Sequence, residues 1–279
     1  MDIRDEEIRK IEGMAKVMRY KALKMAFSAG ANGAHLGAGM SSMEILASLY
    51  GGIMKFDAKN PRCKNRDRLI ISKAHCVLSY YTALVQAGFI DDQDLDLFET
   101  NEGYLPGHPV MNEDKGIEFS GGSLGLGLSL GVGMALAAKK TEKDHRIFVI
   151  LGDGECDEGS VWEAAMSAAH FKLDNLVAII DRNRLQYDGE THDIMDLGDF
   201  NSKWQSFGWE TTEIDGHNVA EIYDSLNGGR KTIGKPYVVI ANTVKGKGVS
   251  FMENRREWHH ARLTKDQYDA AIKELNNLG

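Results

Sequence analysis

The sequence has little cysteine and no excess of basic residues, and each shortage excludes a class of protein. The 279 residues include 3 cysteines, Cys63, Cys76 and Cys156. Their spacing fits neither a zinc ribbon nor a CxxC pair, and they are too few for a disulfide framework. Lys and Arg number 33 against 41 Asp and Glu, which gives a net charge of −8. Without a basic excess we expect no nucleic-acid partner, and the cysteine usage predicts a reducing, cytoplasmic environment.

Targeting and membrane-spanning signals are also lacking. The charged N-terminus MDIRDEEIRK is not followed by the hydrophobic region of a signal peptide. One uncharged stretch, residues 119–138, contains 6 Gly and 3 Ser among its 20 residues. This mixture is typical of a Gly-rich loop that leads into a buried helix rather than of a lipid-facing span. We therefore expect no membrane partner.

The 4 prolines are scattered and no linker separates two compositions. We predict a single domain over residues 1–279 with a helical N-terminal extension. Apolar periodicity predicts helices over about the first 25 residues, 42–54, 75–87, 161–171 and 265–278, and short apolar runs predict strands at 69–71, 147–151, 176–181 and 237–241. This alternation is typical of an α/β fold with a mainly parallel sheet covered by helices on both faces. Ligands bind such sheets at the carboxyl ends of the strands.

A Gly-Asp-Gly motif, Gly152-Asp153-Gly154, follows one of these strands and precedes a helix. It is not a dinucleotide fingerprint, because GxGxxG would require glycine where Asp157 stands. A carboxylate between two glycines near a helix N-terminus suits a diphosphate bridged by a hard cation. Asn183 follows the next strand, 30 residues after Asp153 (183 − 153 = 30). Its amide oxygen and the backbone carbonyl of Leu185 could complete the protein's share of an octahedral site.

These two motifs resemble the diphosphate-and-metal motif of thiamine diphosphate enzymes, and further segments narrow the resemblance to transketolases. The matching segments are Gly33 to Ala38, Arg66 to His75, Leu105 to Pro109, Gly121 to Gly125, Leu173 to Leu176, Asp215 to His217, Thr243 to Met252 and Trp258-His259. The similarity extends from about residue 10 to 262 and is confined to the N-terminal, diphosphate-binding part of a transketolase. The chain resembles the N-terminal subunit of a split, two-gene transketolase, which implies the thiamine diphosphate-binding fold.

The resemblance implies a role for each residue that matches a family motif. Asp153, Asn183 and the Leu185 carbonyl would hold Mg²⁺, or Ca²⁺ or Mn²⁺ in its place. The implied cofactor-binding residues are His35, His75, Gly122, Ser123, Leu124, Gly152, Asp153, Gly154, Glu158, Asn183, Leu185 and His259. The implied catalytic residues are His35, His108 and His259, whose imidazoles would steady an alkoxide that develops on the substrate. His260 follows His259, so the sequence leaves open which of the two rings reaches the site.

The implied activity is transfer of a two-carbon ketol unit from a ketose or its phosphate to an aldose or its phosphate. A C-terminal transketolase subunit, which carries the pyrimidine-binding domain, would complete the site in an α₂β₂ assembly. Two alternatives stay open: another thiamine diphosphate enzyme, acting in specialised sugar synthesis or on 2-oxo acids, and a cofactor-binding module without turnover. Leu36 and Cys76 depart from the residues usual at their positions, so the donor and acceptor sugars stay undetermined.

Other polar residues receive a structural interpretation. We expect four histidines to be structural or exposed: His145, His170, His192 and His217. The basic residues Arg66, Arg68, Lys245 and Lys247 could be solvated loop charges, and we assign them no substrate contact.

Overall fold

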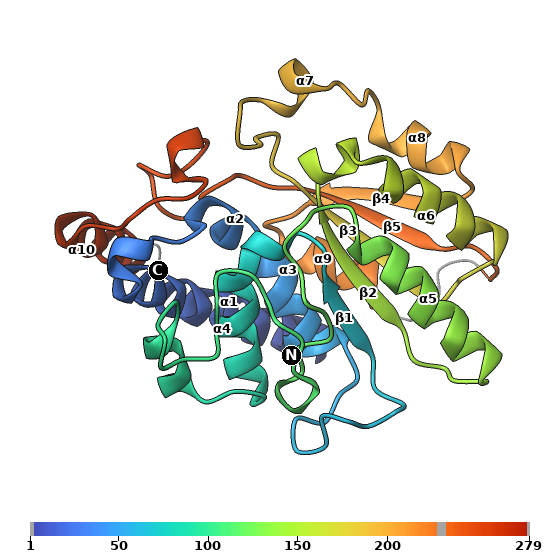
Figure 1. Cartoon of the computed structure of the whole chain (residues 1–279), viewed down its shortest axis with the longest axis horizontal. Helices are drawn as coiled ribbons and strands as arrows, with labels where there is room; N and C mark the ends of the chain where they lie inside the picture. Colours follow the sequence, from blue (N-terminus) through green and yellow to red (C-terminus); the bar gives the residue numbers. More distant parts are fainter. Residues whose placement is uncertain (1–2, 228–232, 278–279) are drawn as a thin grey trace.

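The protein is described by a computed structural model that covers residues 3–227 and 233–277. Within these residues the core is a parallel sheet of five strands in the order β1-β2-β3-β5-β4 (Figure 1). The strands are β1 (Arg68–Ile71), β2 (Ile147–Gly152), β3 (Leu176–Arg182), β4 (Glu210–Asp215) and β5 (Tyr237–Asn242). The register pairs Gly152 of β2 with Asp181 of β3. The carboxyl ends of these two neighbouring strands therefore lie side by side.

The strands are continuous apolar runs because both faces of the sheet are covered. Ile70, Val149 and Ile180 belong to one apolar cluster, and the alternate residues Ile71 and Ile150 belong to the other. Parallel strands buried on both faces read as uninterrupted Val, Ile and Leu rather than as alternating patterns. The predicted α/β fold with a helix-covered parallel sheet is confirmed.

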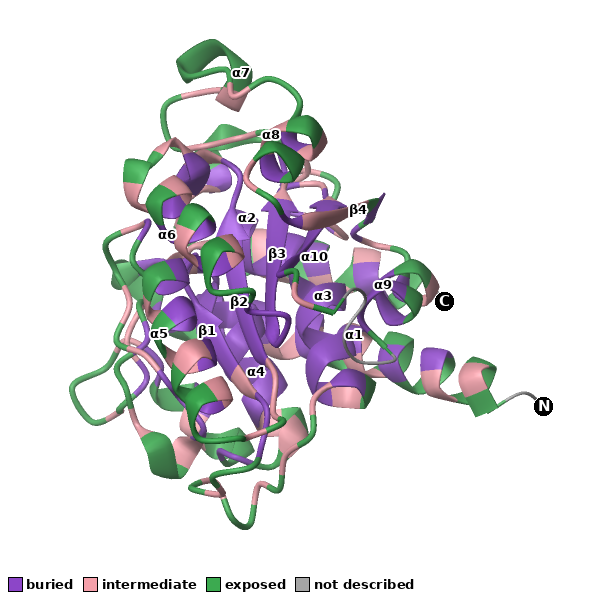
Figure 2. Cartoon of the chain, turned by 90° about the vertical axis from the view of Figure 1, so that its right-hand side faces the viewer, coloured by how far each residue is buried: buried purple, intermediate pink, exposed green. Residues whose placement is uncertain are grey.

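Two groups of helices cover the sheet (Figure 1). One face carries α1 (Ile3–Ser28), α3 (Met43–Ser48), α4 (Val77–Ala87) and α9 (Val219–Leu226). The other carries α5 (Gly127–Lys140), α6 (Gly159–His170) and α8 (Phe200–Ser206). Figure 2 shows the sheet buried between them, with exposed residues on the outward faces of the helices. Helices α2 (Leu36–Ser41) and α10 (Lys265–Asn277) contribute buried residues to the same apolar cluster as the first group, whereas α7 (Thr191–Ile194) has no buried residue.

The predicted helices and strands are present in the structure, but the helices α7, α8 and α9 were not predicted. The helix expected over 42–54 is α3 followed by a π-helical turn, Leu49–Ile53, and the short helix α2 precedes it. Strand β4 was not predicted, because its sequence ETTEID is mostly polar and its residues, apart from Ile214, are half buried or exposed at the edge of the sheet. The last residue of the predicted helix 265–278 lies outside the described residues. Over 3–227 and 233–277, the helices are all too short or too polar to cross a membrane.

Candidate functional site

A cavity of about 300 Å³ lies at the carboxyl ends of the central strands, where the topology predicts a site. Its lining residues come from the segments that follow β1, β2, β3 and β5, together with loops near residues 35, 108, 122 and 259. They are His35, Lys73, His75, His108, Gly122, Leu124, Gly152, Asp153, Gly154, Glu155, Asn183, Leu185, Gln186, Tyr187, Asp188, Lys245 and His259. Carboxylate, amide, ammonium and imidazole groups thus converge on one hollow.

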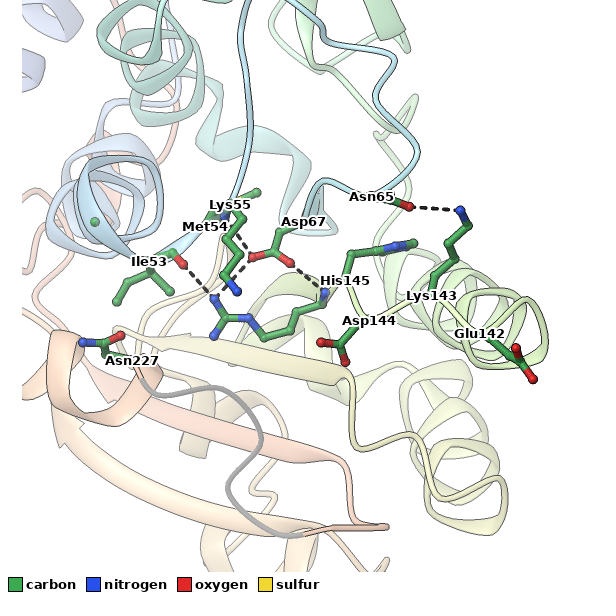
Figure 3. A pocket seen from close by; sticks show the side chains of 12 residues that line it. Ile53, Met54, Lys55, Asn65, Asp67, Glu142, Lys143, Asp144, His145 and Asn227 are labelled. Atoms are coloured by element: carbon green, nitrogen blue, oxygen red, sulfur yellow. Dashed lines mark hydrogen bonds and ion pairs between the residues drawn. The ribbon is translucent and has the colours of Figure 1, made fainter.

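A larger hollow, of about 940 Å³, lies at the opposite, amino ends of β1 and β2 (Figure 3). There the guanidinium of Arg146 donates to the carbonyl oxygen of Ile53 at 2.7 Å and lies 3.3 Å from the Asp67 carboxylate. Asp67 also accepts hydrogen bonds from the backbone N–H groups of Lys55 and Arg146. These groups are engaged in holding the strand ends together, so we place the chemistry in the smaller cavity.

Asp153 and Asn183 meet at the carboxyl edge of the sheet, as their spacing predicts. Asp153 follows β2, is 4% exposed, and accepts hydrogen bonds from the N–H of Gly154 at 3.0 Å and of Arg184 at 2.6 Å. The side-chain oxygen of Asn183 accepts from the N–H of Leu185 at 3.1 Å. Burial raises the pKa of the Asp153 carboxyl, with the nearby Asp181 carboxylate adding to the shift. A cation bound here would relieve this cost, and the donors are the oxygens that Mg²⁺ prefers.

Lys245 joins this edge to the histidines. Its Nζ donates to the carbonyl oxygen of Leu185 at 2.8 Å and lies 2.9 Å from Nδ1 of His259. The side chain is 1% exposed, and burial, together with the Lys73 ammonium, lowers its pKa to about 7. The expectation of a solvated charge is therefore wrong for Lys245. It is also wrong for Arg66, which is 4% exposed and paired with Glu118.

A second buried lysine, Lys73, also lines the cavity. Lys73, directly after β1, lies 2.6 Å from Asp181 of β3 through its Nζ, and Asp181 also accepts from the hydroxyls of Ser41 and Thr243. Although burial alone would raise it, the Lys73 ammonium lowers the pKa of the Asp181 carboxyl. This ion pair connects the ends of two strands beneath Asp153.

Five histidine rings form a cluster at one side of the cavity. The ring of His35 lies 5.4 Å from His75, 5.3 Å from His108, 5.6 Å from His259 and 4.5 Å from His260, between centroids. The rings of His75 and His259 stack at 5.1 Å. Both His259 and His260 thus reach His35. His259 lines the cavity, whereas His260 lines an adjoining hollow that also includes His259.

Three of these imidazoles are neutral near pH 7. Burial, with the adjacent His260 and His259 rings, lowers the pKa of His35 to about 3. Burial, with the Lys245 ammonium, lowers the pKa of His259 to about 3. Burial and the Lys73 ammonium hold the pKa of His75 well below its ordinary value. A neutral ring has one donor and one acceptor nitrogen, so these rings can orient hydroxyl and carbonyl groups without adding charge.

The cluster depends on an antiparallel bridge between two distant segments. Ala34 and Ala261 exchange backbone hydrogen bonds, N–H to O, of 2.9 and 3.0 Å. Gly33 precedes this bridge with φ of +70°, and a Cβ atom there would lie 2.9 Å from the carbonyl oxygen of Ala261. Only glycine fits so close to the partner backbone. The bridge brings His35 beside His259 although 224 residues separate them (259 − 35 = 224).

The Gly-rich loop of residues 121–125 forms another wall. Buried Glu155 accepts hydrogen bonds from the N–H of Gly125 at 2.8 Å and of Gly152 at 3.0 Å, so it ties this loop to the end of β2. Around Gly122 the described chain leaves open space within 4 Å of a Cβ position. The buried Oε1 of Gln186, which lines the cavity, has no hydrogen-bond partner among residues 3–227 and 233–277. The cavity therefore presents open backbone and an unused acceptor to a ligand.

Most of the predicted site residues line the cavity, with two exceptions. Ser123 is exposed between Gly122 and Leu124, and Glu158 is exposed at the start of α6, so neither is among the lining residues. Sequence reasoning missed Lys73, Glu155, Gln186, Tyr187, Asp188 and Lys245. Their positions shortly after β1, β2, β3 and β5 indicate that they lie at the carboxyl edge of the sheet, but do not indicate that the two lysines are buried.

The four histidines interpreted as structural or exposed, His145, His170, His192 and His217, do not line the cavity. His170 and His192 are exposed. The ring of His217 is bound on one side to Glu44 and on the other to the N–H of Val244. Leu36 and Cys76, the two residues that depart from the family pattern, do not line the cavity either. Both are fully buried in the apolar core.

Comparisons with known proteins agree with this geometry. Residues 12–277 match the family described as transketolase, thiamine diphosphate binding domain. The chain is 42% identical, over 96% of its length and 96% of the relative, to one subunit of apulose-4-phosphate transketolase of Actinobacillus succinogenes. It is 40% identical, over 96% of its length and 97% of the relative, to 6-deoxy-6-sulfo-D-fructose transketolase subunit SqwG of a Clostridium species.

A solved structure shares the fold. The transketolase of Campylobacter jejuni superposes with a TM-score of 0.87 at 30% identity, over 99% of this chain. This chain spans 43% of that protein, which is less than half of its length. With a family match over nearly the whole chain and two relatives of 40% identity or more, the protein belongs to the family of transketolase thiamine diphosphate-binding domains.

Proposed function

We propose that this chain is the thiamine diphosphate- and Mg²⁺-binding subunit of a heteromeric transketolase. The enzyme would transfer a two-carbon ketol unit from a ketose or ketose phosphate to an aldose or aldose phosphate. The observation that carries the proposal is the convergence of Asp153, Asn183 and the histidine cluster on one cavity at the sheet edge. A thiamine diphosphate enzyme of the 2-oxo acid dehydrogenase class would share the carboxylate and the amide but would not be expected to share His35, His75 and His108 in these settings.

The proposed metal ligands are Asp153, Asn183 and the carbonyl oxygen of Leu185. All three supply oxygen, which suits Mg²⁺ and also Ca²⁺ or Mn²⁺ as substitutes. The Leu185 oxygen already accepts from Lys245. Because a carbonyl oxygen has two lone pairs, it can keep this hydrogen bond and still ligate a cation.

The remaining contacts divide between the two ends of the cofactor. His75, Gly152 and Gly154 are proposed to contact the diphosphate, whose charge Lys73 and Lys245 would offset. Backbone groups of the loop at Gly122, Ser123 and Leu124 are proposed to contact the aminopyrimidine. Glu158, which the structure leaves exposed at the start of α6, fits a contact with the partner subunit better than a contact within this cavity.

When bound, thiamine diphosphate supplies the nucleophilic carbon and the electron sink that ketol transfer requires. The proposed catalytic residues His35, His108 and His259 would face the substrate carbonyl and its hydroxyl groups. A neutral imidazole can donate a hydrogen bond to an oxygen on which negative charge develops, and can accept one from a sugar hydroxyl. The Lys245 ammonium, 2.9 Å from Nδ1 of His259, orients that ring and favours a proton on its other nitrogen.

A C-terminal transketolase subunit is the proposed partner. The two matched relatives are named as subunits, and this chain spans 43% of a full transketolase chain. Exposed apolar side chains that a partner could cover include Tyr187, which lines the cavity, and Val110, Met111 and Leu126, which lie close in sequence to the lining residues His108 and Leu124. An α₂β₂ assembly, a single domain over residues 1–279 and a cytoplasmic location stay predictions.

The relatives' names favour a specialised sugar as the substrate over a sugar of general metabolism. One is named for apulose 4-phosphate and the other for 6-deoxy-6-sulfo-D-fructose. Both names describe sugars that carry an anionic group, so we propose a ketose phosphate or a comparable anionic ketose as donor.

The test is ketol transfer by this chain alone and with its co-purified partner, in the presence of thiamine diphosphate and Mg²⁺. Xylulose 5-phosphate and ribose 5-phosphate are the first substrates, followed by other anionic ketoses. Activity in the mixture and not with the separate chain would support a split transketolase. Failure of the mixture to bind thiamine diphosphate in calorimetry would refute the proposal.

A further inference from the structure

His217 connects the helices on one face of the sheet to the loop that carries Lys245. It lies in the turn after β4, outside the residues that line the cavity. Its Nε2 accepts a hydrogen bond from the N–H of Val244 at 2.8 Å. Its Nδ1 lies 3.0 Å from Oε2 of Glu44. Because Nε2 accepts, the proton is on Nδ1, which donates to the Glu44 carboxylate.

The Glu44 carboxylate, which contacts this ring, is itself held in place by other residues. It lies on α3, is 8% exposed, and its Oε2 accepts from the guanidinium of Arg19 on α1 at 2.8 Å. Burial alone would raise the pKa of the Glu44 carboxyl, but the Arg19 guanidinium and the His217 ring lower it to about 2. The carboxylate therefore stays charged at neutral pH, and the side of the His217 ring that faces Glu44 is held as a donor.

The loop that receives this support is the one that brings Lys245 into the cavity. Val244 directly precedes Lys245, whose Nζ reaches both the Leu185 oxygen and His259. The following residue, Gly246, donates its N–H to the carbonyl oxygen of Gly37 at 3.0 Å. The backbone of Lys245 is thus held on its two sides, by the His217 ring at residue 244 and by α2 at residue 246.

We propose that His217 is a positioning residue for the site: by accepting the N–H of Val244, it sets where Lys245 stands relative to the Leu185 carbonyl and His259. The inference rests on the proposed function, since it gives Lys245 a place beside the diphosphate and the metal. It extends the site through a chain of four residues, Arg19, Glu44, His217 and Val244, to helix α1, whose residues are not among those that line the cavity.

Two conservative variants separate this role from a purely structural one. In His217→Gln the side-chain oxygen occupies about the place of Nε2, so the hydrogen bond from Val244 can persist while the contact with Glu44 is lost. In His217→Asn the amide nitrogen occupies about the place of Nδ1, so the contact with Glu44 persists while the bond from Val244 is lost. If His217 acts only through its buried contact with Glu44, His217→Asn should retain more cofactor affinity than His217→Gln. If His217 positions the loop through Val244, His217→Gln should retain more.

The measurements are the dissociation constant for thiamine diphosphate in Mg²⁺ by calorimetry, and amide hydrogen exchange of the peptide containing residues 243–247. Both are made on the complex with the partner subunit, well below the unfolding temperatures of the variants. We expect His217→Asn to weaken cofactor binding by about tenfold or more and to accelerate exchange at Val244, and His217→Gln to stay within about twofold of the native complex.

Three results would overturn the inference. If the native complex binds the cofactor and His217→Asn binds it equally well, positioning by His217 is refuted while the proposed function stands. If affinity in both variants falls only in proportion to their loss of thermal stability, the role of His217 is structural. If the native complex itself binds no thiamine diphosphate, the proposed function fails, and this inference fails with it.

Discussion

The Nζ atom of Lys245 lies 2.9 Å from Nδ1 of His259, so a buried ammonium and a neutral imidazole share one hydrogen bond at the centre of the site. The same Nζ reaches the carbonyl oxygen of Leu185 at 2.8 Å. One side chain thereby links the proposed metal site to the histidine cluster. Lys245 thus connects Leu185 and His259, which are far apart in the sequence.

Replacement of Lys245 by Met is expected to weaken thiamine diphosphate binding while leaving the fold intact. The loss of a charge-assisted contact to an anion would raise the dissociation constant by about tenfold to a hundredfold. Because burial lowers the pKa of Lys245 to about 7, its charge is held at a cost in free energy, and Met fills a similar volume without that cost. Calorimetry gives the affinity, and thermal unfolding is expected to show an unchanged or higher midpoint.

Lys247 is the matched control for this change. It lies on the same loop, but its ammonium is 3.4 Å from Glu253 and is partly exposed. Lys247→Met should leave cofactor affinity unchanged. Equal losses in the two variants would mean that general loop charge, rather than the contacts of Lys245, accounts for the effect.

Replacement of Asp153 by Ala is expected to abolish Mg²⁺-dependent cofactor binding without unfolding the chain. Removal of a direct ligand should cost at least about a hundredfold in affinity, since even outer-shell partners contribute tenfold or more. Burial raises the pKa of this carboxyl, so its removal does not take away a stabilised charge. Calorimetry with and without Mg²⁺ provides the measurement. A native dissociation constant in the variant would contradict the proposed metal site.

The central strands and the proposed metal residues could be predicted from sequence because their signals are local. Strand β2 is a run of apolar residues followed at once by Asp153, and β3 is followed by Asn183. The parallel register then brings the two side chains to one edge. Strand β4 was missed because an edge strand of half-buried polar residues has no apolar run.

The histidine cluster and the buried lysines could not be derived from spacing. His35, His108 and His259 stand on separate loops, and their meeting depends on the Ala34–Ala261 bridge, for which the sequence gives no local signal. The resemblance to transketolases supplied these histidines instead. Lys245 was interpreted as solvated because lysines are almost always exposed. Its burial follows from acceptors on two other segments, which a linear pattern does not reveal.

The neutral histidines predict how stability depends on pH. In the unfolded chain His35 and His259 titrate near 6.5, whereas in the fold both pKa values are about 3. Between pH 6.5 and 3 the unfolded state therefore binds more protons, so the free energy of unfolding decreases as the pH falls through this window. Above pH 6.5 both rings are neutral in the folded and the unfolded chain, so none of this stability is lost there.

Urea unfolding at several pH values between about 4 and 7 tests this dependence. Buried carboxylates such as Glu44, whose pKa is lowered to about 2, act in the same direction, so the native slope alone is not diagnostic. His35→Asn and His259→Asn should each give a shallower slope than the native chain, because each removes one group that takes up a proton on unfolding. Slopes that match the native one would contradict neutral histidines in the fold.

Replacement of Gly33 by Ala is expected to disrupt the bridge that assembles the histidine cluster. Its φ of +70° is strained for alanine, and the added Cβ would lie 2.9 Å from the backbone oxygen of Ala261, which cannot rotate away. Gly30 is the control, because its φ of +55° is also positive while open space surrounds its Cβ position. We expect Gly30→Ala to lower the free energy of unfolding by about 1 kcal/mol and Gly33→Ala by about 2–4 kcal/mol. If the bridge sets the position of His35 relative to His259, Gly33→Ala should also reduce kcat of the complex far more than Gly30→Ala does, and equal effects of the two substitutions on both quantities would show that backbone strain alone is responsible.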